Sequence, residues 1–206
     1  MCIKKIGVLG SVLAVLSCAT AGEERPAETA GQAAVNSAPV ASTVVLETTK
    51  GEIVLELYPQ DAPETVVNFL RYVRAGFYNG LIFHRVMSGF MVQAGAMTTE
   101  MVTRSTNIFP IPNEAENGLK NVRGALAMAR MSDPHSATSE FFINHTDNVV
   151  LDFKNRTPSG WGYTVFGRVT SGMEVVDSIA AGSVTRRGSR ANFPVDPVTI
   201  VRAYVP

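Results

Sequence analysis

Apolar and polar residues alternate along many short stretches of this chain, which is the pattern of half-buried β-strands. In one of them Ile53, Leu55 and Leu57 alternate with Glu52 and Glu56. Gly, Pro, Asn and Ser separate the stretches, so we expect many short strands joined by turns. The predicted strands are Val44–Thr48, Ile53–Leu57, Leu81–Val86, Phe90–Gln93, Ala125–Ala129, Phe141–Asn144, Thr164–Arg168 and Val198–Val205.

Two stretches have a helical period instead. The first carries an apolar stripe at i, i+3, i+4 and i+7, formed by Val66, Phe69, Leu70 and Val73. Asp61 and Glu64 have the spacing of a capping box, Pro63 suits a first turn, and Gly76 suits the C-terminal cap. A second helix is predicted over 173–181. Many strands with only two helices indicate a mainly β protein, an antiparallel barrel whose ends the helices could close.

The N-terminal 42 residues have a different pattern. Two lysines precede the apolar run Ile6–Leu16, which is typical of a signal peptide and too short to span a membrane. Cleavage before Cys18 would leave a lipidated first residue, and cleavage after Ala21 would leave a soluble protein. We favour the lipoprotein signal because the only other cysteine is Cys2.

The following stretch lacks large apolar residues and is rich in Ala, Glu, Thr, Gly and Pro, so we expect a disordered tether. The predicted organisation is a signal peptide over 1–18, a tether over 19–42 and one domain over 43–206. Such a protein would be exported to a bacterial periplasm and touch a membrane only through a lipid on Cys18.

Composition narrows the classes of partner and chemistry. The chain has 206 residues with 18 basic and 18 acidic side chains and no visible basic stripe, which argues against nucleic acid binding. The domain contains no cysteine, its three histidines lack metal-ligand spacing, and no Gly-x-Ser-x-Gly elbow occurs. We therefore expect no metal, no cofactor and no covalent catalysis.

The first candidate for chemistry is Arg85, which follows an aromatic stretch and is costly to bury unpaired. Period two places Met91 and Gln93 on one face of their strand, and Glu140 and Phe142 on one face of another. Spacing alone favours an ordinary half-exposed sheet. The alternative is a groove with an apolar floor and one cation, suited to a ligand that carries a carbonyl.

Other polar residues are interpreted as supporting structure. His84 is expected to be a hydrogen-bonded structural histidine, and His135 a solvated one. Glu114 and Glu116 are expected to be solvated. They lie in the polar stretch 96–123, which is long enough for a loop to be more often functional than idle.

Several sequence blocks, taken in order, resemble the signature blocks of the cyclophilin-type peptidyl-prolyl cis-trans isomerases. They are Phe83-His84-Arg85-Val86, Gly89-Phe90-Met91-Val92-Gln93, Gly124-Ala125-Leu126-Ala127-Met128-Ala129 and Ser139-Glu140-Phe141-Phe142-Ile143. The resemblance runs from about Val44 to Val205, and the segment Asn113–Leu119 makes it most similar to the periplasmic bacterial branch. It implies a closed eight-stranded antiparallel β-barrel capped by two α-helices.

The resemblance also assigns roles to positions. Arg85 matches the catalytic arginine, and Gln93 matches the amide that positions substrate and arginine. The remaining matches are substrate-binding positions: Phe90, Met91, Phe142 and Leu151 for the proline ring, Ala129 and Arg130 for the substrate backbone, Glu140, and Tyr163, where many relatives have a histidine.

The implied reaction suits these residue types. Rotation about a peptide bond faces a barrier of about 18–20 kcal/mol because of resonance. Isomerisation breaks no bond, so the protein needs only to bind the twisted amide better than either planar form. A guanidinium N–H such as that of Arg85 can hydrogen-bond to the proline nitrogen once twisting localises its lone pair.

Two departures from the family pattern lead to hypotheses. Glu140 replaces the usual glutamine and, if it reached Arg85, it could hold the arginine away from substrate and make turnover low or pH-dependent. Val150 stands where many eukaryotic relatives have a tryptophan, which predicts weak binding of cyclosporin.

The sequence thus predicts an exported, monomeric prolyl isomerase that acts on proline-containing segments of unfolded or folding envelope proteins. The alternative is a tethered module that binds such segments in the same pocket without useful turnover.

Overall fold

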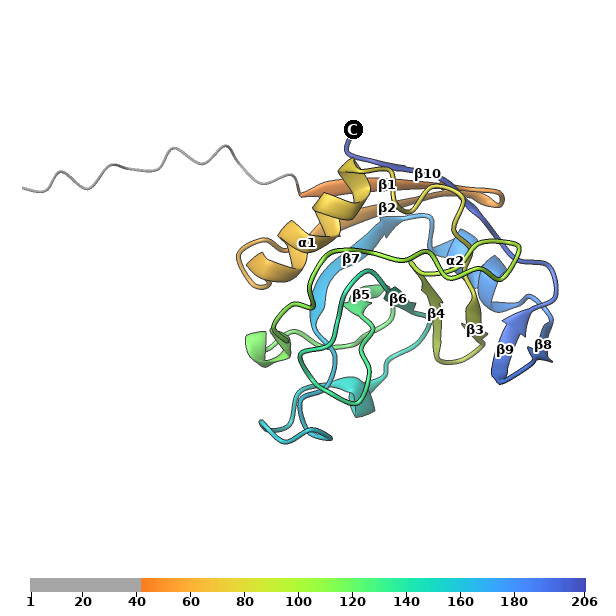
Figure 1. The fold of residues 1–206 in the computed structure, drawn as a ribbon. Helices are drawn as coiled ribbons and strands as arrows, with labels where there is room; N and C mark the ends of the chain where they lie inside the picture. Colours follow the sequence, from red (N-terminus) through yellow and green to blue (C-terminus); the bar gives the residue numbers. More distant parts are fainter. Residues whose placement is uncertain (1–41) are drawn as a thin grey trace, which may run out of the picture. The chain divides into compact units, whose positions relative to one another are not determined.

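The computed structural model describes residues 42–206. The predicted signal peptide, Cys18 and all but the last residue of the predicted tether therefore lie outside the described residues. The described part contains one eight-stranded antiparallel sheet, two α-helices and a separate two-stranded hairpin (Figure 1). None of its helices is both long enough and apolar enough to cross a membrane.

The strands of the large sheet follow the order β10-β1-β2-β7-β5-β6-β4-β3. Their bounds are β1 (Thr43–Thr48), β2 (Gly51–Leu57), β3 (Arg85–Met87), β4 (Met91–Ala94), β5 (Ala125–Met128), β6 (Phe141–Asn144), β7 (Val165–Ser171) and β10 (Ile200–Tyr204). The hairpin consists of β8 (Val184–Arg187) and β9 (Arg190–Pro194). The helices are α1 (Pro63–Arg74) and α2 (Met173–Ala180), with two short 3₁₀ turns, η1 (Ala115–Asn117) and η2 (Val149–Leu151). Each of the eight strands and two helices predicted from the sequence has a counterpart, but β3 begins only at Arg85, four residues after the predicted start at Leu81. The hairpin β8–β9 was not predicted.

The predicted closure of the barrel is wrong. The sheet is a curled half-barrel whose edge strands, β10 and β3, form no ladder with each other. The segment before β3 meets β10 through an isolated bridge between Ile82 and Thr199. Backbone hydrogen bonds accompany this bridge, from the Phe83 N–H to the Val198 carbonyl at 3.0 Å, from the Ile200 N–H to the Leu81 carbonyl at 2.8 Å and from the Gly80 N–H to the Ile200 carbonyl at 2.8 Å. The chain leaves strand geometry at Phe83 and His84 before β3 begins, so the contact cannot continue as a ladder.

Each face of the sheet carries its own apolar cluster. The larger cluster includes Phe141 and Ile143 of β6 together with Val92 of β4, and both helices pack on it. The smaller cluster lies on the opposite face and includes Phe142 of β6 and Met91 of β4. The alternation predicted for β6 is therefore confirmed, and it leaves apolar residues on a face that neither of the two α-helices of the described residues covers.

Helix α1 is held on the sheet by aromatic contacts. The Phe69 ring lies 5.4 Å from the Phe141 ring, edge to face, and 5.2 Å from the Phe166 ring, between centroids. The four residues of the predicted apolar stripe are all buried, so the helical period is confirmed. Gly76 has a φ of 64°, the left-handed conformation expected of a residue that ends a helix.

The start of α1 is capped from a distant loop, and the predicted capping box is wrong. Residue 62, at the N-cap, makes no side-chain cap hydrogen bond. Instead the Glu114 carboxylate accepts hydrogen bonds from the backbone N–H of Glu64 at 3.1 Å and of Thr65 at 2.9 Å. The Thr164 hydroxyl accepts from the Glu114 N–H at 2.9 Å and fixes that loop. Glu114 is therefore a structural carboxylate at the positive end of a helix, and the expectation that it is merely solvated is also wrong.

We expect Glu114→Ala to lower the free energy of unfolding by about 1–2 kcal/mol, because two backbone donors and a helix dipole lose their partner. Chemical denaturation followed by circular dichroism measures this loss. Glu116→Ala is the matched control, since Glu116 only forms an exposed ion pair with Arg156 and should cost less than about 0.5 kcal/mol. Equal losses for the two variants would contradict the capping role.

Candidate active site

A cavity of about 210 Å³ opens on the sheet face that carries the smaller apolar cluster. Its lining residues come from β3, β4, β6, the end of β5, η2 and the segment before β7. They are Arg85, Phe90, Met91, Gln93, Ala129, Arg130, Phe142, Leu151 and Tyr163. The structure thus brings together nine of the ten residues of the domain that the sequence analysis named as site residues, and the tenth, Glu140, lies beside Gln93.

Strand register positions the polar residues of this site. In the β3–β4 ladder Arg85 lies directly opposite Gln93, and in the β4–β6 ladder Gln93 lies opposite Phe142. Directly opposed residues project to the same face of a sheet. The Arg85 guanidinium, which is exposed at the rim of the cavity, donates a hydrogen bond from Nη1 to Gln93 Oε1 at 3.2 Å.

Glu140 acts on Gln93 and makes no ion pair with Arg85. Gln93 Nε2 donates to Glu140 Oε2 at 2.6 Å, and His84 Nε2 lies 3.3 Å from the same oxygen. Arg85 takes part in none of the ion pairs found within residues 42–206. The premise that Glu140 holds Arg85 away from substrate is therefore wrong: Glu140 instead anchors the amide nitrogen of Gln93, which leaves the amide oxygen facing Arg85.

Close packing of two segments brings Glu140 to Gln93. Gly95, which follows β4, has a φ of 101°, and a Cβ there would come within 2.5 Å of the Ser139 carbonyl. Only glycine allows this approach, so Gly95 lets Glu140 lie against β4.

The environment of Glu140 favours its ionised form. Burial raises the pKa of the Glu140 carboxyl, but the hydrogen bond and charge interaction with His84, the hydrogen bond from Gln93 and the charge of Arg190 together lower the pKa below its ordinary value. The other ring nitrogen of His84, Nδ1, is buried and has no partner in the described part of the chain.

Aromatic and cationic groups form the far wall of the cavity. The Phe142 and Tyr163 rings meet edge to face with centroids 5.6 Å apart, and the Arg130 guanidinium lies 4.8 Å from the centre of the Tyr163 ring. Arg130 Nε also donates to the Gly162 carbonyl at 2.8 Å, so its side chain is fixed as part of the wall. The Ala129 N–H already donates to the Glu140 carbonyl at 3.0 Å and is not free to pair with a ligand.

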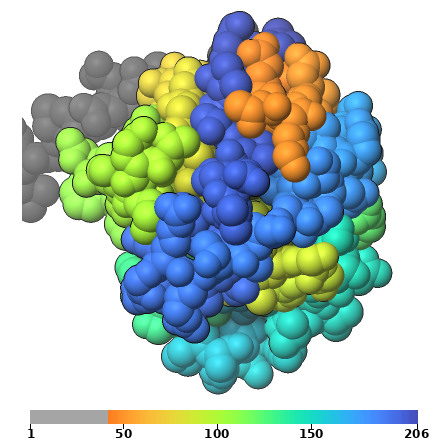
Figure 2. Space-filling model, turned by 90° about the vertical axis from the view of Figure 1, so that its right-hand side faces the viewer, coloured from red at the N-terminus to blue at the C-terminus, as the bar shows by residue number. Residues whose placement is uncertain are grey.

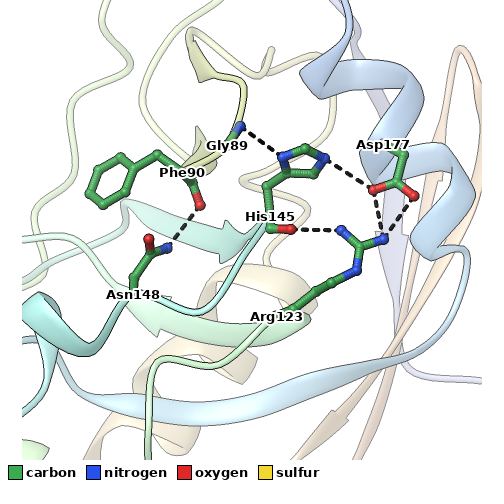
Figure 3. A network of polar contacts seen from close by, with 6 residues as sticks. All are labelled: Gly89, Phe90, Arg123, His145, Asn148 and Asp177. Atoms are coloured by element: carbon green, nitrogen blue, oxygen red, sulfur yellow. Dashed lines mark hydrogen bonds and ion pairs between the residues drawn. The ribbon is translucent and has the colours of Figure 1, made fainter.

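Sequence reasoning missed the residues that hold the loop of Phe90 (Figure 3). Asn148 Nδ2 donates to the Phe90 carbonyl at 2.8 Å, and the Gly89 N–H donates to His145 Nδ1 at 3.0 Å. The opposite nitrogen, His145 Nε2, lies 3.2 Å from Asp177 Oδ1 on α2. In this geometry Nδ1 accepts and Nε2 carries the proton. The only sequence signal was the run of four polar residues, His145-Thr146-Asp147-Asn148, that directly follows β6.

Asp177 also links the loop of Phe90 to Arg123, which lies just before β5. Arg123 Nη2 donates to both Asp177 carboxylate oxygens at 2.8 Å, and Arg123 Nη1 donates to the His145 carbonyl at 2.6 Å. The position of Phe90 is thus fixed by a network that reaches α2. By contrast, His135 is exposed at the surface, as predicted. It also has a structural role that was not predicted, because its Nδ1 accepts from the Asn113 N–H at 3.0 Å and its ring packs on Trp161.

Comparison with known proteins decides the family. The family described as "Cyclophilin type peptidyl-prolyl cis-trans isomerase/CLD" matches residues 43–205. This chain belongs to the cyclophilin-type peptidyl-prolyl cis-trans isomerases. Its reaction class is therefore isomerisation of X–Pro peptide bonds, and cyclophilins bind proline-containing peptides.

Curated bacterial relatives match most of the cyclophilin domain. Peptidyl-prolyl cis-trans isomerase cyp18 of Streptomyces antibioticus is 53% identical over 164 residues, which cover 80% of this chain and 98% of the relative. Peptidyl-prolyl cis-trans isomerase B of Escherichia coli (strain K12) is 50% identical over 157 residues, which cover 76% of this chain and 95% of the relative.

Solved cyclophilin structures share the fold. A Cryptosporidium parvum cyclophilin crystallised in the presence of the dipeptide Ala-Pro matches with a TM-score of 0.68 and 26% identity, covering 80% of this chain and 98% of that one. The cyclophilin AquaCyp293 from Hirschia baltica matches with a TM-score of 0.64 and 24% identity, covering 81% of this chain and 74% of that one, and supports the fold alone.

The Gln93–Glu140 hydrogen bond leads to a prediction for this cyclophilin. Glu140→Gln keeps an acceptor for Gln93 Nε2, so we expect kcat/KM on an X–Pro peptide to stay within about twofold of the parent. Glu140→Leu removes the acceptor and frees the amide to turn its N–H toward Arg85, so we expect about a tenfold loss, equivalent to about 1.4 kcal/mol. A tenfold change in the glutamine variant would contradict this account.

The lowered pKa of Glu140 adds a pH criterion. Because the folded-state pKa lies below the ordinary value of 4.5, the charge is present above that pH and is lost only as pH falls through the lower folded value. Between pH 8 and about 5 the parent and Glu140→Gln should therefore have parallel pH–activity profiles. Profiles that diverge in this interval would contradict the prediction.

For the loop of Phe90 we expect His145→Ala to raise the KM for X–Pro peptides about three- to tenfold, because the Gly89 N–H loses its acceptor and Phe90 becomes mobile. Asp177→Asn is the matched control: it keeps an acceptor near His145 Nε2 and should change KM less. Steady-state kinetics at fixed pH, with circular dichroism to verify folding, measures both. An unchanged KM in His145→Ala would rule out the positioning role.

Proposed function

We propose that this cyclophilin isomerises X–Pro bonds in exported polypeptides that are still folding, and that Arg85 is its catalytic residue. The observation that carries the catalytic assignment is the position of Arg85. Its guanidinium is exposed at the rim of an apolar cavity, has Gln93 Oε1 as an acceptor and has no carboxylate within 4.0 Å in the described part of the chain.

The geometry suits a reaction that moves atoms without breaking bonds. An apolar cavity can hold the proline ring against Met91, Phe142 and the neighbouring rings while the preceding carbonyl rotates. As the amide twists, its nitrogen loses conjugation and becomes a better hydrogen-bond acceptor. Arg85 would donate to that nitrogen mainly in the twisted state, and such a preference lowers the barrier.

Gln93 would act as the positioning residue for Arg85. One hydrogen bond from Arg85 to the Gln93 amide leaves most of the five N–H groups of the guanidinium for substrate. The Glu140 carboxylate on the other side of Gln93 keeps the amide oxygen in the accepting position. Arg85 is thereby oriented without being neutralised by an ion pair.

The proposed setting rests on the sequence of the N-terminal segment. The lysines, the apolar run and Cys18 have the arrangement of a lipoprotein signal. Folding envelope proteins expose X–Pro bonds whose uncatalysed isomerisation takes tens to hundreds of seconds, so an isomerase held there would have abundant substrates. Mass spectrometry of the mature protein would test this setting. A lipid on Cys18 supports anchoring, a terminus after Ala21 supports a soluble protein, and an uncleaved chain would contradict export.

Removal of the Arg85 guanidinium tests the catalytic role. We expect Arg85→Ala to lower kcat/KM for an X–Pro peptide about 100-fold or more, because a donor specific to the transition state is lost. Peptide affinity, measured by titration, should change only a few-fold. Arg202→Ala is the matched control, since Arg202 is an exposed arginine on β10 outside the cavity, and its activity should equal the parent's.

The same experiment separates an enzyme from a binding module. A parent protein that binds the peptide without accelerating isomerisation would favour the module. Full activity in Arg85→Ala would contradict the catalytic role of this residue while leaving the family's activity in place.

A further inference from the structure

A second cavity, of about 340 Å³, adjoins the first. Four of its lining residues are the polar residues of the candidate active site that contact one another: His84, Arg85, Gln93 and Glu140. The other three come from β9 and are Arg190, Ala191 and Asn192. Because Arg85 and Gln93 line both cavities, a peptide bound in the first can continue directly into the second.

The wall of the second cavity is the hairpin β8–β9, which packs against β3 (Figure 1). In the space-filling view the hairpin, in blue, lies beside the yellow-green surface of the segment that contains β3 (Figure 2). The hairpin carries Arg186, Arg187 and Arg190 within five residues, and all three are exposed. The polypeptide therefore concentrates positive charge next to the site, although its overall formal charge is +0.

These arginines form no ion pair within residues 42–206, although the charge of Arg190 acts on Glu140 across the cavity. None of the three lies within 4.0 Å of a carboxylate in the described residues. Elsewhere on the surface Arg123 and Arg168 each pair with a carboxylate at 2.8 Å. A cluster of unpaired guanidiniums repels itself, and an acidic ligand would relieve this repulsion.

The backbone of the hairpin is also unusual where it lines the cavity. Asn192 has a φ of 58°, one of two positive values found for non-glycine residues of the described chain. Asparagine adopts this left-handed conformation more readily than other residues with a side chain, and here it shapes the strand that lines the cavity. The only carboxylate in the lining, Glu140, already accepts from Gln93 and contacts His84, so the two guanidiniums of the lining remain available.

We propose that this second cavity is a substrate subsite in which Arg190 binds the carboxylate of an acidic residue close to the isomerised proline. Arg186 and Arg187 add attraction from the rim. A guanidinium binds a carboxylate through two parallel hydrogen bonds, which gives geometry as well as charge. An extended peptide advances about 3.3–3.6 Å per residue, so the acidic residue would lie within a few positions of the proline. The subsite rests on the proposed function, since it selects among substrates of the same isomerase site.

Matched peptides test the subsite. Short peptides with one X–Pro bond carry Glu, Gln or Lys in turn at each of the two positions before and after the proline. At one position we expect kcat/KM to be about three- to tenfold higher for Glu than for Gln, and lower for Lys, at low salt. The preference should nearly vanish in about 0.5 M NaCl, because exposed charges are screened.

Variants of the hairpin assign the preference to Arg190. Arg190→Gln should abolish the preference, so that the variant turns over the Glu and Gln peptides with equal kcat/KM. Arg190→Glu should reverse it in favour of Lys, and Arg202→Gln, the matched control, should retain it. Circular dichroism verifies that each variant is folded. Retention of the full preference in Arg190→Gln would overturn the assignment.

Dissociation constants for the same peptides keep this test separate from that of the proposed function. If no peptide is turned over, the isomerase proposal fails. The subsite is then tested by affinity alone: tighter binding of the Glu peptide than of the Gln peptide supports it, and equal binding overturns it. Equal rates and equal affinities for Glu, Gln and Lys at every position would overturn the subsite alone. Arg190-dependent binding to vesicles of anionic phospholipid, with no peptide preference, would likewise overturn it in favour of a membrane-facing hairpin.

Discussion

The antiparallel register of β3, β4 and β6 is the constraint on which the site depends. It sets Arg85 opposite Gln93 and Gln93 opposite Phe142, so a cation, an amide and an aromatic ring project from one face in a row. A slip of one residue would send all three toward the larger core and bring Val92 or Ile143 to the surface. Burial of Val92, Phe141 and Ile143 resists such a slip, and the packing of the core therefore fixes the geometry of the site on the other face.

The polar residues of the site are linked in series, and each contact fixes the orientation of the next side chain. His84 and Gln93 share one oxygen of Glu140, and Gln93 offers its own oxygen to Arg85. An ionised carboxylate only accepts hydrogen bonds, so Glu140 determines which end of the Gln93 amide faces Arg85. From the sequence, Glu140 was expected to compete with substrate for Arg85. In the structure it instead fixes Gln93, and Gln93 orients Arg85.

Local periodicity predicted much of this fold, and distant contacts account for what it missed. Alternation in 141–144 separated core from surface residues, and the helical stripe of α1 was read from i, i+3 and i+4 spacing. The family resemblance named the residues of the first cavity. Glu114 could not be recognised as a helix cap, because its partners lie about fifty residues earlier in the chain. The open edge of the sheet and the contact between Gly89 and His145 depend on how segments meet in space, which no local pattern records.

The two cavities suggest how a prolyl isomerase can be selective without altering its chemistry. Every X–Pro substrate offers the same ring, so in the proposed reaction a cavity that binds the ring and an arginine that donates to the twisted nitrogen cannot tell one substrate from another. Discrimination has to come from flanking residues, where a change in binding leaves the reacting amide untouched. The hairpin β8–β9 is a separate two-stranded unit that lines only the second cavity, so its residues can vary without disturbing the ladders that position Arg85. Under the two proposals, the shared Arg85–Gln93 pair lies at the boundary between the cavity in which the X–Pro bond is isomerised and the cavity that binds a flanking acidic residue.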